Sequence, residues 1–159
     1  MLNLYQRFVD WFAGTPWGAQ IARRAANRVD KVLIKLTNGR ITSGIGTNYG
    51  KKIGMLHCTG AKSGKPREVP LLYTEHEGNI LLFASKGGDP GNPAWYFNLK
   101  AYPDCVFQNK KGKTDRRARL AEGEERERLF EVCAANYPGY RAYQERVERL
   151  IPIMILEPR

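Results

Sequence analysis

Apolar residues between positions 52 and 85 come in short runs that are separated by turn signals. Each run has the length of a β-strand, and residues 77–79 (EGN) predict a tight hairpin between the last two runs. Pro70 lies inside the second run. Because proline has no N–H to donate to a strand ladder, it predicts an edge strand or a bulge. The predicted strands are KIGMLHCT (52–59), REVPLLYTEH (67–76) and NILLFAS (79–85).

The second half of the chain alternates between helical and strand patterns. Asn92-Pro93 is expected to cap a short helix at 93–101. A hairpin is expected from 104–109 to 113–122 across the charged residues KKGK, and helical patterns follow at 122–137 and 139–150. The run IPIMILEP (151–158) predicts a final, fully apolar strand. Several antiparallel strands with flanking helices predict an α+β domain built on a small barrel or sandwich.

The first 50 residues have a different, helical character. Residues 2–12 predict an amphipathic helix rich in Trp, Phe and Tyr, and residues 16–37 predict a second helix with Thr15 as N-cap. The first helix suits either docking on the protein's own core or lying in a membrane interface, and both alternatives stay open. We therefore divide the chain into a helical, basic segment (1–50) and a β-rich domain (51–159).

Composition narrows the class of protein. The chain has 159 residues with 42% hydrophobic and 26% charged residues, which is typical of one soluble globular domain. No apolar run approaches the ~20 residues of a membrane-spanning helix. Three widely spaced cysteines and two histidines argue against a disulfide framework and against a metal site. We expect a cytoplasmic protein. If the first helix lies in a membrane interface, we expect the protein at the inner face of the cell membrane.

Positive charge is concentrated in the first half of the chain. The net charge is +10, and residues 1–68 carry +9 of it. Such a surface raises the local concentration of anions. Candidate partners are nucleic acid, anionic lipid or a polyanionic small molecule; a solvated basic face is the plainer alternative.

The stretch HCTGAKSGKPREVP (57–70) resembles a phosphate-binding loop. A Walker A loop needs four residues between its glycines, whereas Gly60 and Gly64 are separated by three, and Lys65 is followed by Pro66. This spacing excludes the nucleotide-hydrolase interpretation. A basic, hydroxyl-rich hairpin that could bind an isolated phosphate remains, beside the alternative of an ordinary exposed turn; its polar residues are Thr59, Lys62, Ser63, Lys65 and Arg67.

Two further motifs are candidates for a binding site. ASKGGDPGNPAW (84–95) follows a buried-looking strand and ends at a helix N-terminus, where glycines let the backbone approach a ligand. Tyr137, Tyr140 and Tyr143 recur at i, i+3 and i+6, and would form an aromatic wall along one side of a helix. Taken alone, each motif also fits a structural role, as a Gly/Pro turn or as core. No nucleophilic triad or acid/base carboxylate pair is evident, so an enzyme of this composition would depend on a cofactor.

Three stretches in unbroken order resemble the deazaflavin-dependent nitroreductase family, the coenzyme F420-dependent quinone reductases. They are TGAKSGKPREVPLLY (59–73), ASKGGDPGNPAWYFNLKAYPD (84–104) and YPGYRAYQ…IPIMILEP (137–158). The resemblance implies a split β-barrel of the flavin-reductase type that binds a deazaflavin with a phospholactyl and oligoglutamate tail. It also implies hydride transfer from reduced F420 to a quinone or nitroaromatic acceptor, without a metal.

The resemblance also implies roles for individual residues. Lys62 and Arg67 would hold the phosphate and the tail, and Ser85 or a tyrosine would steady or protonate the reduced product. Family members often have TGRKSG where this chain has Ala61, so one contact to the tail is expected to be missing. The residues implied to contact the coenzyme are Lys62, Ser63, Gly64, Arg67, Pro70, Leu71, Ser85, Lys86, Gly87, Ala94, Trp95 and Asn98, and those implied to border the acceptor are Ser85, Tyr137, Tyr140 and Tyr143.

Two other classes of function remain as alternatives. One is a split barrel that uses FMN, or that binds F420 only to carry it. The other is a basic nucleic-acid-binding domain, for which aromatic residues should be interleaved with basic ones. The tyrosines of this chain lie far in sequence from its basic half, which disfavours that class.

Overall fold

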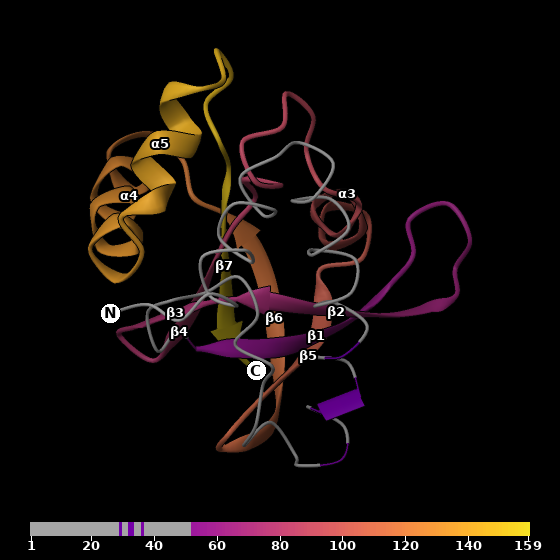
Figure 1. Ribbon diagram of the computed structural model, residues 1–159. Coiled ribbons are helices and arrows are strands. Elements are labelled where there is room, and N and C mark those ends of the chain that lie inside the picture. Colours follow the sequence, from indigo (N-terminus) through magenta and orange to yellow (C-terminus); the bar gives the residue numbers. More distant parts are fainter. Residues whose placement is uncertain (1–28, 30–31, 34–35, 37–51) are drawn as a thin grey trace, which may run out of the picture.

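A computed structural model of the chain describes residues 29, 32, 33, 36 and 52–159 (Figure 1). The four described positions before residue 52 are helical, in line with the predicted second helix. The predicted helix 2–12 lies outside the described residues, and so does the basic segment 1–50 apart from these four positions. Among the described residues, no helix is long and apolar enough to cross a membrane.

Seven strands form one antiparallel sheet. Its order is β2-β1-β5-β6-β7-β4-β3, and its ends curl toward each other so that β2 contacts β4. The result is a split half-barrel, as expected, with strands near the front crossing those behind (Figure 1). The strands are β1 (Ile53–Thr59), β2 (Pro66–Leu72), β3 (Thr74–His76), β4 (Asn79–Phe83), β5 (Asp104–Asn109), β6 (Gly112–Leu120) and β7 (Ile153–Pro158).

The predicted strand 67–76 is divided in two at Tyr73. The part before Tyr73 pairs with β1 and the part after it pairs with β4, so one continuous sequence pattern serves both ends of the sheet. The Tyr73 ring turns inward and packs edge-on against Phe107, with ring centroids 5.0 Å apart. Pro70 lies in β2 and pairs with Met55 of β1. Because β2 is a terminal strand of the sheet, the predicted edge position of Pro70 is confirmed.

The predicted turns are mostly tighter than the sequence suggested. Glu77 and Gly78 both have positive φ (49° and 78°) in the β3–β4 hairpin, the geometry of a two-residue turn that follows the twist of the strands. The β5–β6 hairpin turns at Lys110-Lys111, because Asn109 already pairs with Gly112.

Within residues 52–159, three helices cover the half-barrel: α3 (Ala94–Ala101), α4 (Gly123–Asn136) and α5 (Gly139–Glu145). The helix predicted over 139–150 is therefore shorter, and residues 146–152 lead irregularly into β7. The predicted cap of α3 also differs. Pro93 is its N-cap and no side chain caps it, since the Asn92 carboxamide accepts a hydrogen bond from Arg149 instead.

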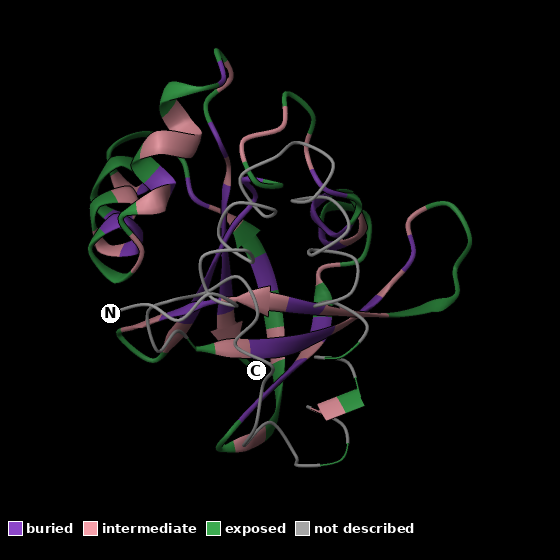
Figure 2. Cartoon of the chain, viewed as in Figure 1, coloured by how far each residue is buried: buried purple, intermediate pink, exposed green. Residues whose placement is uncertain are grey.

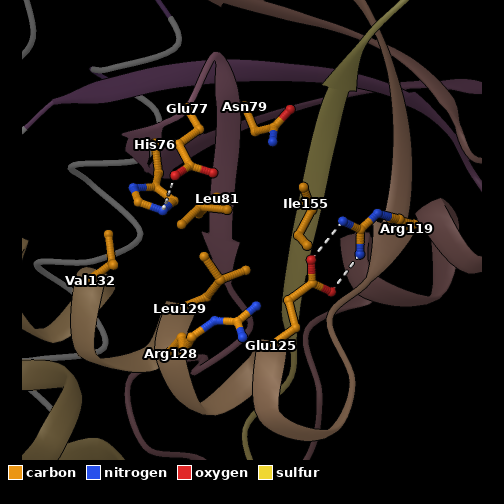
Figure 3. Close-up of a pocket in the computed structure, with 10 residues that line it drawn as sticks. All are labelled: His76, Glu77, Asn79, Leu81, Arg119, Glu125, Arg128, Leu129, Val132 and Ile155. Atoms are coloured by element: carbon orange, nitrogen blue, oxygen red, sulfur yellow. Dashed lines mark hydrogen bonds and ion pairs between the residues drawn. The ribbon is translucent and has the colours of Figure 1, made fainter.

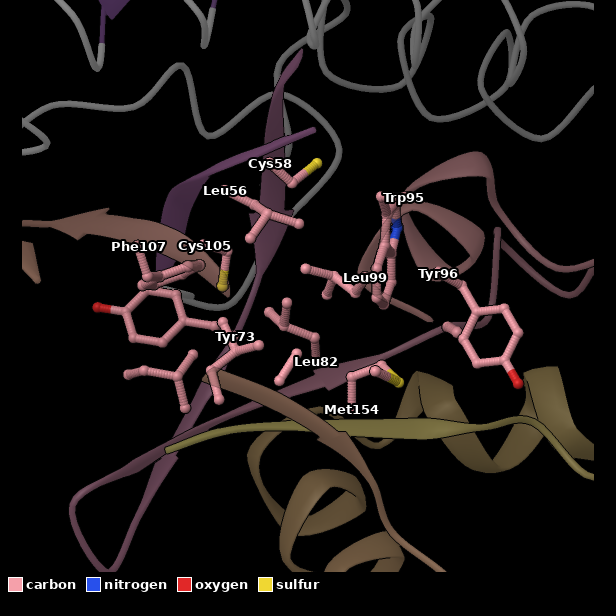
Figure 4. Packing of buried hydrophobic residues seen from close by; sticks show 14 residues of the cluster. Leu56, Cys58, Tyr73, Leu82, Trp95, Tyr96, Leu99, Cys105, Phe107 and Met154 are labelled. Carbon is pink, nitrogen blue, oxygen red and sulfur yellow. The ribbon is translucent and has the colours of Figure 1, made fainter. Parts of the chain in front are cut away.

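Alternate residues of β4 and β7 enter two separate cores. Leu82 and Met154 face the barrel interior, where they join Phe107 and residues of α3 (Figure 4). Leu81 and Ile155 face the opposite side, beneath α4 and α5. Because side chains alternate along a strand, a strand that is covered on both faces must be apolar at every position. This explains the apolar residues 153–156 of β7, all four of which are buried (Figure 2).

Candidate functional site

The turn between β1 and β2 has a defined backbone. The Gly60 N–H donates to the Lys65 carbonyl at 2.9 Å, and the Gly64 N–H donates to the Gly60 carbonyl at 2.8 Å. Gly64 has φ +64°, a conformation that favours glycine. A Cβ on Gly60 would come within 2.7 Å of the Ser63 Oγ, so a side chain has no room there.

The basic side chains of this turn point to solvent without acidic partners. Lys62, Lys65 and Arg67 are exposed, and none of them forms an ion pair with a carboxylate among residues 52–159. The Arg67 guanidinium donates to the Ser63 Oγ at 3.3 Å, which gathers donors on one side of the turn. Together, residues 59–67 form a "basic loop" whose charge is not neutralised within the described protein.

Asn98 connects the basic loop to α3. Its Oδ1 accepts a hydrogen bond from the Ala61 N–H at 2.9 Å, and its Nδ2 donates to the Cys58 Sγ at 3.7 Å. The Asn98 carboxamide thus holds the loop against the helix. Trp95, one turn earlier, is only 6% exposed and packs into the barrel core beside Leu99 (Figure 4).

The second predicted motif forms a "glycine loop" (84–92) at the end of β4. Lys86, Gly87 and Gly88 have φ values of 52°, 75° and 81°, so three consecutive residues are left-handed. The Ser85 side chain is buried, and its Oγ accepts a hydrogen bond from the Gly87 N–H at 3.4 Å. Lys86 Nζ lies 3.0 Å from Asp89 Oδ1, and this lysine, unlike those of the basic loop, has a carboxylate partner.

The three tyrosines do come together, but not along one helix. Tyr137 ends α4 and the other two belong to α5, with the Tyr137 and Tyr143 hydroxyls 3.1 Å apart. Tyr140 is core: it is 4% exposed, and its ring centroid lies 4.4 Å from that of Phe83. Burial raises the pKa of Tyr140 well above its ordinary value. Of the three tyrosine side chains predicted to form an aromatic wall, only the Tyr137–Tyr143 pair therefore lies outside the core.

The glycine loop lies directly against α5, the helix that contains Tyr140 and Tyr143. A Cβ on Gly88 would be 3.4 Å from the Tyr143 Cδ1 and 3.4 Å from the Arg146 Cδ. Figure 1 shows this loop between α3 and α5, whereas the basic loop projects on the other side of α3. Three motifs that are separated in sequence therefore border one region, with α3 between the two loops.

Ionisable groups buried near these motifs are not poised for nucleophilic chemistry. Burial raises the pKa of the Cys58 thiol, and raises that of Cys105 to about 12 and that of Cys133 to about 11. Thiols with such values are protonated at neutral pH. Within the part of the chain that the structure describes, no three His, Cys, Asp or Glu side chains are grouped to hold a metal ion.

Two cavities of the described structure lie away from the glycine loop. One of about 480 Å³ lies between the β3–β4 hairpin and α4, and none of the predicted site residues lines it (Figure 3). A shallower groove of about 350 Å³ beneath the basic loop is lined by Arg67, but also by Asp104 and Asp115. Since carboxylates repel phosphate, this groove suits the coenzyme tail less well than the outer side of the loop.

The curled antiparallel sheet with its flanking helices defines the class of protein as a split-barrel protein. The barrel of the heme storage protein HutZ from Vibrio cholerae has the same fold, with a TM-score of 0.52 at 9% identity, over 82% of this chain and 90% of that chain. At this identity the likeness concerns the fold alone.

The family is given by closer relatives. The model of the F420H(2)-dependent quinone reductase family matches residues 27–158, and the chain belongs to this family. An F420H(2)-dependent quinone reductase of Mycobacterium tuberculosis is 35% identical over 141 residues, which cover 83% of this chain and 89% of that protein. The solved structure of the F420-H2 dependent reductase FDR-A is 48% identical with a TM-score of 0.62, over 66% of this chain and 93% of that chain.

Family membership confirms the enzyme class expected from the sequence. The protein is an oxidoreductase that uses coenzyme F420 and transfers a hydride from its reduced form to a quinone. The split-barrel fold is likewise confirmed.

Two residues shape the site through contacts that the sequence does not predict. Asn98, which is predicted to line the coenzyme, also holds the basic loop. Arg149 lies in a predicted helical segment and is not among the predicted site residues, although it contacts the glycine loop at five acceptors. No sequence signal marks either role, because both depend on residues that lie 37 to 65 positions away.

Proposed function

We propose that the basic loop binds the phosphate and the oligoglutamate tail of F420. The observation that carries this proposal is the absence of acidic partners for Lys62, Lys65 and Arg67 among the described residues. Cations that are left unpaired beside a backbone turn are suited to a charge-assisted contact with phosphate or carboxylate oxygens. Ser63 adds a hydroxyl to this set, and Gly64 lets the turn close.

The glycine loop and α3 are proposed to receive the deazaflavin ring. Gly87 is exposed and has no side chain, so a flat ring can approach its backbone. Ser85 and Trp95 are largely buried and would form the back of the site rather than its rim. The other residues proposed to contact the coenzyme are Pro70, Leu71, Lys86, Ala94 and Asn98.

Ala61 changes the basic loop without disturbing its backbone. Its N–H is held by Asn98, so the turn keeps its shape although the side chain carries no charge. We propose that Lys65, which is exposed on the same turn, supplies the tail contact that an arginine at position 61 makes in relatives.

The Tyr137–Tyr143 pair is proposed to border the acceptor. When bound, reduced F420 supplies the hydride, and the protein's part is to orient the acceptor and exclude water. Two phenols in mutual hydrogen-bonding distance can pass a proton toward the reduced product while the pair stays hydrogen-bonded. Ser85 is the alternative donor, and Tyr140 acts from below by supporting both rings. A nitroaromatic compound is proposed as a second acceptor, since it is also flat and electron-poor.

Association with an anionic membrane surface is proposed for the segment 1–50, and a cytoplasmic position for the whole protein. The amphipathic sequence of residues 2–12 and the charge of the first half support it. Deleting residues 1–15 should reduce sedimentation with anionic liposomes while leaving reduction of a water-soluble quinone analogue unchanged. Equal sedimentation of both proteins would exclude this role.

Coenzyme binding and turnover test the central proposal. The purified protein should bind F420 by isothermal titration calorimetry more tightly than FMN, and should reoxidise reduced F420 in the presence of a soluble quinone analogue. Equal affinity for both cofactors would overturn the assignment of the basic loop to the deazaflavin tail.

A further inference from the structure

Arg149 is hydrogen-bonded to the glycine loop along its whole length. Its Nη1 donates to the Asn92 Oδ1 at 2.7 Å. Its Nη2 lies within hydrogen-bonding distance of four backbone carbonyls that span eight residues of the chain. These are the carbonyl oxygens of Ala84 (3.2 Å), Ser85 (3.4 Å), Asp89 (3.1 Å) and Gly91 (3.2 Å).

The planar shape of the Arg149 guanidinium matters as much as its charge, because its partners are neutral acceptors. Arg149 forms no ion pair among the described residues, and its Nε is buried without a hydrogen-bond partner there. Burial lowers the pKa of Arg149 from its ordinary value. A half-buried cation that is surrounded by carbonyl oxygens orients those oxygens toward itself, and a planar fork can do this at several points at once.

The glycine loop needs such an anchor because its backbone is unusual. Lys86 is left-handed although it is not glycine, and it begins a run of three left-handed residues. Such conformations persist only where surrounding contacts hold them. The carbonyls bound by Arg149 lie immediately before and after this run.

Arg149 is itself held by α5, through Gln144. Its carbonyl accepts a hydrogen bond from the Gln144 Nε2 at 2.9 Å, and the Gln144 Oε1 accepts from the Ile151 N–H at 3.0 Å. The same Oε1 accepts from the Arg126 Nη2 at 2.9 Å, which ties the segment to α4. Through Arg149, the glycine loop is therefore held in a fixed position relative to α5, the helix that carries Tyr143.

We propose that Arg149 is a positioning residue that holds the glycine loop, before any ligand arrives, in the shape that receives the coenzyme. The inference rests on the assignment of this loop to F420 proposed above. A loop that is already ordered does not lose conformational entropy when it binds, so removing Arg149 should weaken coenzyme binding. Once the coenzyme is bound the loop contacts are restored, and the maximal rate should change much less.

Two variants of Arg149 and one control test the proposal. Arg149→Met keeps the aliphatic stem and loses the fork, and Arg149→Lys keeps the charge. Arg141→Met is the matched control, because Arg141 lies on α5, the helix that contacts Arg149 through Gln144, and pairs with Glu131 on the exposed surface. We expect Arg149→Met to raise the Kd for F420 about 10- to 100-fold, the range for hydrogen bonds to a charged group. Arg149→Lys should recover only part of this loss, and Arg141→Met should bind as the native protein does.

Hydrogen–deuterium exchange without coenzyme gives the second readout. In Arg149→Met the amides of residues 85–92 should exchange faster, whereas those of β1 and β5 should keep their protection. Native affinity in Arg149→Met, or full recovery in Arg149→Lys, would overturn the proposal, the latter because charge alone would then suffice. Uniform loss of protection across the barrel in both variants would also overturn it, since Arg149 would then serve general stability. Failure of the native protein to bind F420 would instead refute the coenzyme assignment.

Discussion

The basic loop and the face formed by β6 and α4 contain the same kinds of cation in opposite situations. On the β6–α4 face, Arg119 contacts both Glu125 and Glu157, and between α4 and α5 Arg141 pairs with Glu131 in the same way. In the basic loop, the three cations have no acidic partner among the described residues. The first set is satisfied within the protein, whereas the second set is available to an external anion.

This contrast separates stability from binding. Paired surface charges contribute modestly to folding, and removing one should not change the affinity for a distant ligand. Unpaired charges repel each other slightly in the free protein and contribute mainly when the ligand arrives. The two regions should therefore respond differently to the same substitution, arginine or lysine to alanine.

The largest expected effect is on coenzyme affinity in the basic loop. Lys62→Ala should weaken F420 binding by about 1–3 kcal/mol, because the phosphate loses a charge-assisted hydrogen bond. Calorimetric titration measures it, with Lys110→Ala as the control, since Lys110 is an exposed lysine in the turn of the β5–β6 hairpin. An unchanged Kd in Lys62→Ala would show that this lysine does not contact the coenzyme.

A smaller effect is expected on stability at the β6–α4 face. Arg119→Ala should lower the free energy of unfolding by about 1 kcal/mol, at the upper end for exposed ion pairs because two carboxylates lose their partner. Urea denaturation measures this loss. The Kd for F420 should stay native; a weakened Kd would mean that the two regions are coupled.

A positive charge at position 61 should increase the affinity of the basic loop for F420, in the opposite direction to Lys62→Ala. Ala61→Arg should tighten binding of F420 by about 0.5–1 kcal/mol, the range of an exposed ion pair with a tail carboxylate. The backbone contact of residue 61 with Asn98 does not involve the side chain, so the loop should keep its shape. Binding of an F420 analogue without glutamates should not improve; equal gains for both would place the new arginine on the phosphate.

The smallest expected effect is a pH dependence of the Arg119 contribution. The hydrogen bond from Arg119 holds the pKa of Glu125 below its ordinary value of 4.5. A carboxylate with a lowered folded-state pKa stabilises the protein fully above pH 4.5 and loses that contribution as the pH falls through the folded pKa. The stability difference between native protein and Arg119→Ala should therefore shrink below pH 4.5. A difference that persists at about pH 2 would show that packing of Arg119, and not its charge, is responsible.

Sequence patterns predicted most elements of the described domain because their signals are local. The β-strands, the helix after Glu122 and the edge position of Pro70 follow from periodicity and backbone chemistry. The division at Tyr73 was missed, since the apolar pattern continues across it while the pairing partner changes. Likewise, the spacing of the tyrosines correctly predicted that they cluster, but could not show that Tyr140 lies beneath the other two.

The amino-acid sequence by itself determined the strands, the surplus of positive charge and, through its three motifs, the family and its coenzyme. These depend on residues that are close together in the chain. Only the tertiary structure decided which cations are unpaired, that Asn98 serves the basic loop, and that Arg149 holds the glycine loop. Each of these depends on contacts between residues 37 to 65 positions apart, whose geometry is set by how the sheet curls and not by local preference.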